Sequence, residues 1–472
     1  MDFNLDLYSI LYFFQLPIDV ILWKIFYWTT WIPFAIFFIN ATKMFWMLEG
    51  WDYFWGKTKF IYLAIDIPKG NEKSPKAVES IITYLGGAHG MPSAYNIYWE
   101  GYYQQSFSFE IVSMEGYIQF VVFLPEKGKG ILESAIYSQY PEAEITEIED
   151  YTKDFPDKFP DEEYDIWGGE FILNHHWALP IRTYKDFEHQ TGDGIQYYDT
   201  MSSLMDVCNS MGKGEHLWHQ ILIKPIGFDW PKECDDKIAE ILKEKKKEVS
   251  FIQRMWSKIG DISEKNLFGK DWSELNSEKD DAMKMMNLKP KEKKQVEAIQ
   301  RKAGQLGFAV KMRFIYIAKK EVFDKTKGAG GIVGYVKQFM DLDLNQIKPD
   351  LSYTATTANY FNVDKRLNQR KTNIILGYKY RSVDMGRYMS IMSIEEIATL
   401  WHFPVENILQ APKLQKVDSK KSEAPIGLPV EANIMERKDV HEEKYISKKI
   451  DDNDLYQEGP KGAPPINLPI DD

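Results

Sequence analysis

An apolar stretch near the N-terminus dominates the hydrophobic pattern of the chain. Residues 25–42 carry no charged side chain and lie between Lys24 and Lys43. As a helix they would extend about 27 Å, close to the roughly 30 Å core of a bilayer. Aromatic rings with one polar edge favour the headgroup layer. Tryptophans gather near both ends of the stretch: Trp23, Trp28, Trp31, Trp46, Trp51 and Trp55. The pattern therefore predicts a membrane span over about 25–46 with an interfacial belt, so the lipid bilayer is the first expected partner.

The residues around this stretch predict its orientation. A shorter uncharged run at 7–18 is too short to cross a bilayer, so we expect an interfacial or partly re-entrant segment. A hairpin of two helices is the alternative, and a buried core helix is the alternative to a membrane span. Residues 1–20 contain aspartates but no Lys or Arg, whereas lysines follow the span. The positive-inside rule then predicts an anchor over 1–56 in the cell inner membrane, with the rest of the chain in the cytoplasm.

Beyond the anchor, the apolar positions change between a period of two and a period near 3.6. This pattern predicts helices at 75–86 and 128–139, and strands at 59–68, 106–113, 117–124 and 143–148. The resulting order is βαββαβ, the ferredoxin-like arrangement of an antiparallel sheet with two helices on one face. We therefore expect an α+β domain over 57–150.

A second, elaborated α/β unit is expected over 151–411. Its predicted strands are 164–173, 179–184, 217–224 and 308–318, with helices near 201–208 and 296–303. A charged insertion at 235–290 interrupts it. Ser393 followed by Glu396 forms a capping box that predicts the start of another helix. Residues 412–472 are rich in charge and proline and poor in aromatics, so we expect a disordered tail.

Composition narrows the function classes. The formal net charge is −12, which argues against direct nucleic-acid binding. Cys208 and Cys234 are the two cysteines, too few for a disulfide framework, in agreement with a reducing cytoplasm.

The motifs give little catalytic chemistry. The Gly-rich stretch 327–334 lacks the spacing of a dinucleotide fingerprint and the Gly-Lys-Ser/Thr ending of a phosphate loop. We expect no enzyme activity and no cofactor. The alternative is a membrane-bound metal-dependent hydrolase that uses His175, His176, His216 or His219. Positions 216 and 219 would face opposite sides of a strand, which argues against a shared ion.

The segment 392–404, MSIEEIATLWHFP, carries a family resemblance. It is similar to a segment of membrane-associated type IV secretion and conjugation ATPases of the TraC/TraD and HerA-like kind, where it closes the N-terminal region before a Pro-rich linker and the motor domain. Segments 72–87, 106–124, 136–150 and 335–340 resemble an uncharacterised prokaryotic family of such N-terminal regions. The resemblance covers roughly 55–411, and no Walker A loop follows the linker-like tail.

The resemblance implies a non-catalytic, membrane-anchored assembly component of a secretion or conjugation-like DNA-transfer machine. Its expected partners are a separate ATPase, other secretion-system subunits or neighbouring copies of the chain. The N-terminal half of a split secretion ATPase is the alternative. The resemblance carries docking roles onto five residues, for which capping and helix termination is the competing explanation: Ser393, Glu396, Trp401, His402 and Pro404.

Overall fold

Strands from most of the chain pair into one antiparallel sheet. The computed structural model describes residues 16–67, 71, 73–191, 194–197, 199–242 and 288–405. Within them the sheet strands are β1 (Phe60–Asp66), β2 (Phe107–Met114), β3 (Tyr117–Pro125), β4 (Glu144–Ile148), β5 (Tyr164–Leu173), β8 (Glu215–Pro225), β9 (Gly307–Lys319), β10 (Ile347–Pro349) and β11 (Ser390–Ser393). A separate hairpin pairs β6 (Glu188–Thr191) with β7 (Gly194–Tyr197).

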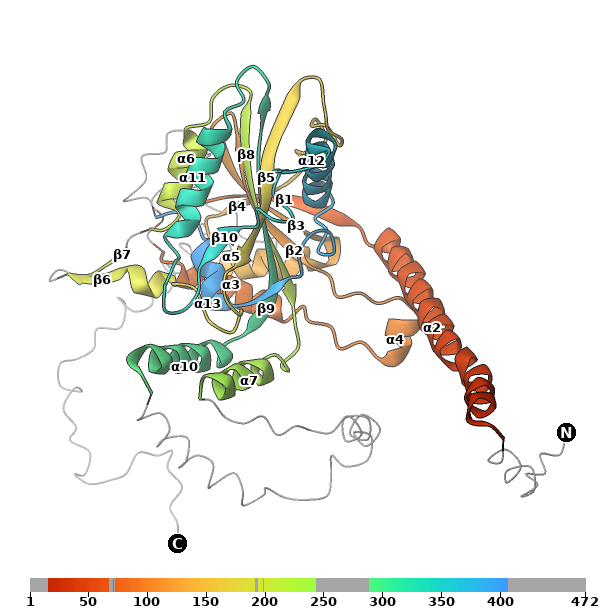
Figure 1. Cartoon of the computed structure of the whole chain (residues 1–472). Helices are drawn as coiled ribbons and strands as arrows, with labels where there is room; N and C mark the ends of the chain where they lie inside the picture. The colour runs from red at the N-terminus through yellow and green to blue at the C-terminus, as the bar shows by residue number, and fades with distance from the viewer. Residues whose placement is uncertain are drawn as a thin grey trace, which may run out of the picture. The chain divides into compact units, whose positions relative to one another are not determined.

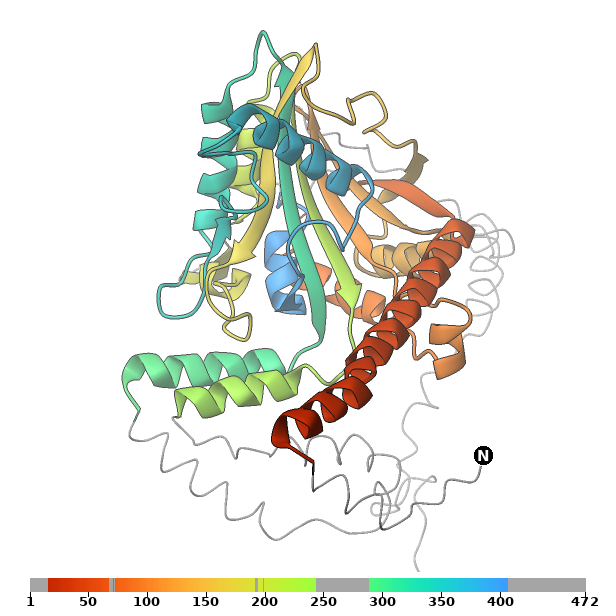
Figure 2. The same ribbon diagram turned by 45° about the vertical axis from the view of Figure 1, so that its right-hand side comes forward.

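The helices precede, connect and follow these strands. They are α2 (Ile18–Lys57), α3 (Lys76–Gly86), α4 (Ala94–Tyr98), α5 (Lys129–Gln139), α6 (Ser202–Asn209), α7 (Pro231–Ile241), α10 (Pro290–Ala303), α11 (Lys325–Lys337), α12 (Val363–Lys379) and α13 (Ile394–Leu400). Two 3₁₀ turns add η1 (Glu126–Gly128) and η2 (Tyr184–Phe187). Helices α7 and α10 lie side by side away from the sheet (Figure 2).

The strand order reveals two parts with the same succession of elements. The order is β10-β5-β9-β8-β2-β3-β1-β4, with β11 added on β9. One part runs β1, α3, β2, β3, α5, β4 and the other runs β5, α6, β8, β9, α11, β10. They join where β2 pairs antiparallel with β8, from Phe107 opposite Ile223 to Met114 opposite His216. The two parts expected as domains thus contribute to one continuous sheet.

The two faces of the sheet are covered differently. Helices α6 and α11 lie over one face and α12 over the other (Figure 1). Side chains of α3, α5, α6, α11 and α13 form one buried cluster with strand residues such as Phe109, Leu217 and Phe314. We call this the apolar face. The opposite face, called the polar face, meets α12 and the segment 150–159 through a smaller apolar cluster that includes Trp218 and Tyr378.

Most elements predicted from periodicity are confirmed. The mixed α+β fold, the antiparallel sheet and the long apolar N-terminal helix are all present. The strand predicted at 179–184 is wrong, because side chains rather than a neighbouring strand satisfy its amides. Ile181 N donates to Glu396 Oε1 at 3.1 Å, and Tyr184 N donates to Thr399 Oγ1 at 2.9 Å. Three predictions lie outside the described residues: most of the 7–18 run, residues 243–287 of the charged insertion, and the 412–472 tail.

Helix α2 contains the predicted span. Among the described residues it is the one helix long and apolar enough to cross a membrane. Its apolar side chains face outward rather than into the core, with Trp23 69% and Trp31 61% exposed. This exposure is the pattern expected when lipid, rather than protein, covers a helix.

Candidate functional site

The docking residues carried over from the family resemblance lie inside the apolar face. Ser393 begins α13 as its N-cap, and Glu396 Oε2 accepts from Ser393 N at 2.9 Å, so the predicted capping box is confirmed. The Glu396 carboxylate also pairs with Lys302 Nζ at 2.8 Å, and both side chains are buried. The two residues therefore fix the start of α13 against α10.

Trp401, His402 and Pro404 complete the end of this helix. The Trp401 ring packs edge-on to Phe109, with 4.8 Å between ring centroids. His402 Nδ1 lies 2.9 Å from Ala398 O and Nε2 lies 3.0 Å from Asp199 Oδ1. All three residues are buried, so their side chains are not accessible to a partner in this structure. Their capping and packing roles are in the structure, and docking through them stays a prediction.

Burial and hydrogen bonding act in opposite directions on Asp199. Burial raises the pKa of this carboxyl. The hydrogen bond and charge of His402, together with the amides of Val405 and Met201, lower that pKa by more than burial raises it, so the net pKa lies below its usual value. The pair therefore favours a charged carboxylate at the end of α13.

The tryptophans of the predicted belt all lie on α2, and those in its C-terminal half contact other parts of the protein. Trp23 and Trp31 are exposed, whereas the side chain of Trp28 lies outside the description. Trp46 and Trp51 contact Trp99 and Tyr103, with centroid separations of 5.5 and 5.3 Å. Trp55 stacks on Phe60 at the start of β1, at 4.9 Å. The second half of the belt thus connects the helix to the body of the protein.

The histidines do not form a metal site in the part of the chain that the structure describes. The ring of His216 meets Phe155 on the polar face, whereas the ring of His219 meets Tyr335 on the apolar face. The predicted opposite orientation of these two residues is confirmed. No group of three or more His, Cys, Asp or Glu side chains converges within the described ranges.

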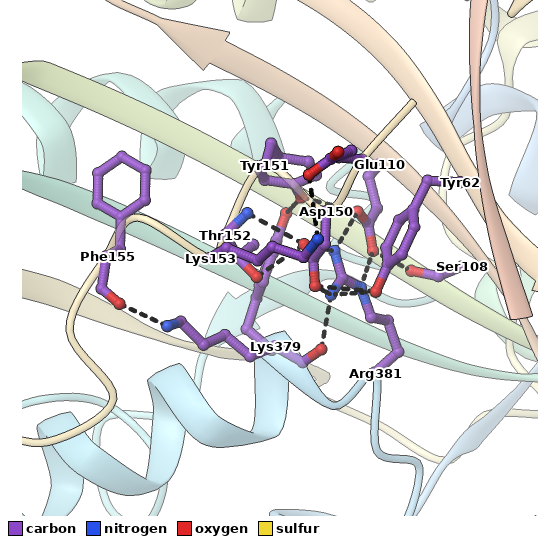
Figure 3. Close-up of polar contacts among 12 residues, drawn as sticks. Tyr62, Ser108, Glu110, Asp150, Tyr151, Thr152, Lys153, Phe155, Lys379 and Arg381 are labelled. Atoms are coloured by element: carbon purple, nitrogen blue, oxygen red, sulfur yellow. Dashed lines mark hydrogen bonds and ion pairs between the residues drawn. The ribbon is translucent and has the colours of Figure 1, made fainter. Parts of the chain in front are cut away.

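The polar face holds a buried charged cluster around Arg381, which sequence reasoning missed (Figure 3). Arg381 follows α12, and its guanidinium bonds to both oxygens of Glu110 on β2, at 3.1 and 3.3 Å. It also bonds to both oxygens of Asp150, at 3.0 and 3.3 Å. Tyr151 Oη donates to Glu110 Oε2 at 2.7 Å, and Tyr62 Oη donates to Asp150 Oδ2 at 2.9 Å. We call these five residues the Arg381 cluster.

The centre of the Arg381 cluster is buried, and its single cation pairs with two carboxylates. The side chains of Arg381 and Glu110 are 1% and 0% exposed. Burial alone lowers the pKa of Arg381, but the nearby Glu110 carboxylate raises it well above its usual value. For Asp150, burial raises the pKa and Arg381 lowers it, with a net decrease. Paired, hydrogen-bonded burial of this kind is the arrangement that a low-dielectric interior tolerates.

Gln220 connects this cluster to a second one. Its Nε2 donates to Glu110 Oε1 at 2.9 Å, and its Oε1 accepts from Arg313 at 3.3 Å. Arg313 Nε donates in turn to Glu170 Oε1 at 3.0 Å. The remaining donors of Arg313 reach the carbonyls of Gly377 and Met385, at 2.7 and 2.6 Å. A continuous polar chain therefore crosses the sheet from β1 to β5.

At its Arg313 end, this chain of hydrogen bonds borders a pocket of about 380 Å³. Glu170 and Arg313 form its floor, and one side of α12 forms its wall. The wall residues recur at helical spacing and face the pocket together: Arg366, Gln369, Arg370, Asn373, Ile374 and Gly377. Arg370 donates to the carbonyls of Ser352, Ala355 and Thr357, so the 352–357 loop forms part of the rim.

The loop after α12 closes the floor of the pocket. Gly386 has φ +94°, and a Cβ there would lie 2.2 Å from Glu170 Oε1, so only glycine fits without displacement. Arg387 N donates to Glu170 Oε2 at 2.7 Å, and Arg387 Nε donates to Asp350 Oδ2 at 2.8 Å. Lys311 donates to the Val383 and Met385 carbonyls, and burial lowers its pKa to about 8.

This geometry is suited to binding an anion. Arg313, Arg366 and Arg370 line the pocket with one carboxylate, Glu170. Both Glu170 oxygens already accept hydrogen bonds from Arg313 and Arg387. Guanidinium and amide groups together form good partners for carboxylate or phosphate oxygens. In the sequence, this site is marked by polar residues at positions 366, 369, 370 and 373. Their helical spacing can be recognised only after α12 has been identified.

Comparisons with known proteins give a family and no function. A family model described as a domain of unknown function (DUF8128) matches residues 98–416, which include the Arg381 cluster except Tyr62, the pocket and α13. No curated protein matches the chain.

Proposed function

We propose that this chain, which belongs to the DUF8128 family of unknown function, is a membrane-anchored docking protein. In this proposal it is a non-catalytic component of a type IV secretion or conjugation-like machine that recruits a separate ATPase. Helix α2 is the observation that carries the proposal, because its exposed apolar surface requires a covering that lipid supplies. The lysines after the span support a body on the cytoplasmic side of the inner membrane.

The strand order supports a finer description of the body. Each part of the sheet has the order second, third, first, fourth strand, with every neighbour antiparallel. This is the order of a ferredoxin-like unit. In the proposal, two such units joined through β2 and β8 form a rigid platform that holds the pocket at a fixed position.

The pocket is the proposed docking point for an acidic segment of the partner. The chain as a whole carries a net charge of −12, yet three of the four charged residues that line this pocket are arginines. A local field of opposite sign to the rest of the surface favours an anionic group and disfavours general adhesion. Arg366 is the most exposed of the three, and it donates to the Asn359 carbonyl at 2.9 Å.

Purification of the full chain from membranes tests this proposal. We expect the protein to stay with vesicles in alkaline carbonate and to bring with it a polypeptide that contains a Walker A loop. The purified chain alone should not hydrolyse nucleotide. Release by carbonate, or nucleotide turnover by the chain itself, would overturn the proposal.

Charge reversal at the pocket tests the docking point. Arg366→Glu should abolish recovery of the ATPase, because it places a carboxylate where the partner's acidic group is proposed to bind. Lys365→Glu is the matched control, since it makes the same charge change at the neighbouring exposed position of α12, which does not line the pocket. Equal recovery with both variants would remove the pocket from the docking proposal.

A further inference from the structure

The segment 91–103, called the α4 segment, packs along α2. Helix α4 lies beside α2 in both views (Figures 1 and 2). Trp46 Nε1 donates to the carbonyl of Tyr98 at 2.5 Å, and Lys43 Nζ lies 5.0 Å from the centre of the Tyr98 ring. Further along, Phe54 meets Tyr102 with 5.5 Å between centroids. From residue 98 to residue 102 the segment thus runs parallel to α2, and the end of α4 lies at the level of residues 43–46.

That level coincides with the expected surface of the bilayer. The uncharged run ends at residue 42. Position 46 lies four residues beyond that end, a rise of about 6 Å along the helix. The headgroup layer is roughly 5–8 Å thick on each side of the hydrocarbon core. If residues 25–42 span the core, α4 therefore lies in the headgroup layer.

The side chains that the α4 segment exposes suit this layer. Met91, Tyr95 and Trp99 are 85%, 63% and 66% exposed, and Tyr98 is 40% exposed. The segment carries one charged residue, Glu100. Trp and Tyr with a free polar edge concentrate at membrane interfaces, whereas a grouped set of exposed aromatics on a water-facing surface is unusual.

A close backbone contact fixes the α4 segment at this height. Gly101 has φ +66°, and a Cβ on it would lie 2.1 Å from the Gly50 carbonyl oxygen of α2. The backbones of helix and segment therefore touch directly, and any larger residue at 101 would push them apart. This contact keeps Tyr95 and Trp99 from moving independently of α2.

We propose that the α4 segment is a second membrane-contacting element that inserts Tyr95 and Trp99 into the headgroup layer beside α2. Its ligand is the lipid interface itself, which it reaches because it packs on α2 at the level where that helix would leave the hydrocarbon core. The inference rests on the proposed membrane anchor. By holding the body through two points rather than one, the segment restricts rotation of the sheet about the α2 axis.

Depth measurements on labelled full chain in phosphatidylcholine nanodiscs test the proposal. Both native cysteines are buried, so a fluorophore attached to an introduced cysteine reports that position alone. The variants are Tyr95→Cys, Phe37→Cys within the run and Tyr388→Cys, which is fully exposed on the body. We expect lipids with a nitroxide near the headgroup to quench label 95, those with a deep nitroxide to quench label 37, and neither to quench label 388.

Each result decides one question. Quenching of label 37 with none at label 95 would overturn the α4 proposal and leave the anchor standing. Loss of quenching at label 37 would overturn the anchor itself. Energy transfer between donor- and acceptor-labelled copies at position 95, without lipid quenching, would assign the surface to a second copy and also overturn the proposal. Gly101→Val should reduce quenching at 95 and leave label 37 unchanged.

Discussion

The two faces of the central sheet use the same strands and bury opposite chemistry. On β2, Phe109 and Ile111 point to the apolar face, while Ser108 and Glu110 point to the polar face. On β9, Met312 and Phe314 alternate with Lys311 and Arg313 in the same way. The apolar face is closed by five helices that bury side chains from both parts of the sheet. The polar face is closed by α12 and by loops that donate and accept hydrogen bonds (Figure 1).

This difference between the faces indicates which of them can stabilise the fold and which can also bind a ligand. A face held by apolar packing tolerates apolar substitutions that conserve volume and offers few polar groups to a ligand. A face held by paired charges depends on each partner, but leaves polar groups free to bind wherever the covering is incomplete. The Arg381 cluster shows the covered state of the polar face, and the pocket above Glu170 and Arg313 shows the open one.

Of the substitutions that test this difference between the faces, removal of Arg381 should cause the largest loss of stability. Arg381→Ala leaves Glu110 and Asp150 buried without their cation, and breaking one side of a buried pair costs about 3–5 kcal/mol. We expect the free energy of unfolding of the full chain, measured by urea titration in detergent, to fall by that amount or the protein to fail to fold.

Two further variants separate charge from volume at this cluster. Lys153→Ala is the exposed control, because its pairing with Glu149 lies at the surface and should contribute little. In Arg381→Met the long side chain is kept and the charge lost, so it should be nearly as damaging as Arg381→Ala. A loss below 1 kcal/mol for Arg381→Met would mean that the polar face is not held by its charges.

Gly386→Ala should have the next largest effect, because it acts where the polar face closes over Glu170. The left-handed backbone and the clash of the new Cβ with Glu170 together should cost about 1–3 kcal/mol. The loop would shift from the floor of the pocket, so binding of the partner should fall as well. Gly330→Ala is a matched control, since no atom lies within 4 Å of a Cβ built there. Equal stability of the two variants would contradict the argument.

The apolar face could be predicted from the sequence, and the polar face could not. The alternation at Phe107, Phe109 and Ile111 predicts β2, and Ser393 with Glu396 predicts the start of α13. Both signals are local. Glu110 and Arg381 are 271 residues apart, and a glutamate between apolar residues in a strand reads as a solvent-facing position. No pattern pairs it with one cation among many.

Helix α12 was missed for a related physical reason. Its buried residues are confined to its last turns, at Ile374, Ile375, Gly377 and Tyr378, so no apolar stripe runs along its length. The polar residues that replace such a stripe form the wall of the pocket. The candidate site was therefore hidden by the same feature that gives it chemistry.

His219 offers a test of the apolar face that depends on pH. Its imidazole is buried near Phe171 and Tyr335, and burial lowers its pKa to about 4. Well above pH 6.5 the ring is neutral in both folded and unfolded chains. As the pH falls towards 4, His219 binds a proton in the unfolded chain but stays neutral in the folded chain, so the free energy of unfolding decreases.

Substitution of His219 by an aromatic side chain should remove this loss. His219→Phe should be more stable than the unmodified chain by about 2 kcal/mol at pH 5, relative to their difference at pH 8. Urea titrations of both proteins at the two pH values measure the change. Asp199 will still destabilise the variant in acid, because its lowered pKa acts in the same direction. An equal difference at both pH values would show that His219 is not buried in its neutral form.

Ser393→Ala should have the smallest effect, and it separates capping from docking. The substitution removes the side-chain oxygen that accepts from Glu396 N and should cost about 1 kcal/mol of stability. Ser393→Asp restores an acceptor and should recover part of that loss, although it places a charge beside Glu396. If Ser393 acts only as a cap, ATPase recovery should follow stability, and both should be nearly normal in Ser393→Ala. A variant with normal unfolding but lost recovery would instead assign the start of α13 to partner binding, and the apolar face would then have a function beyond packing.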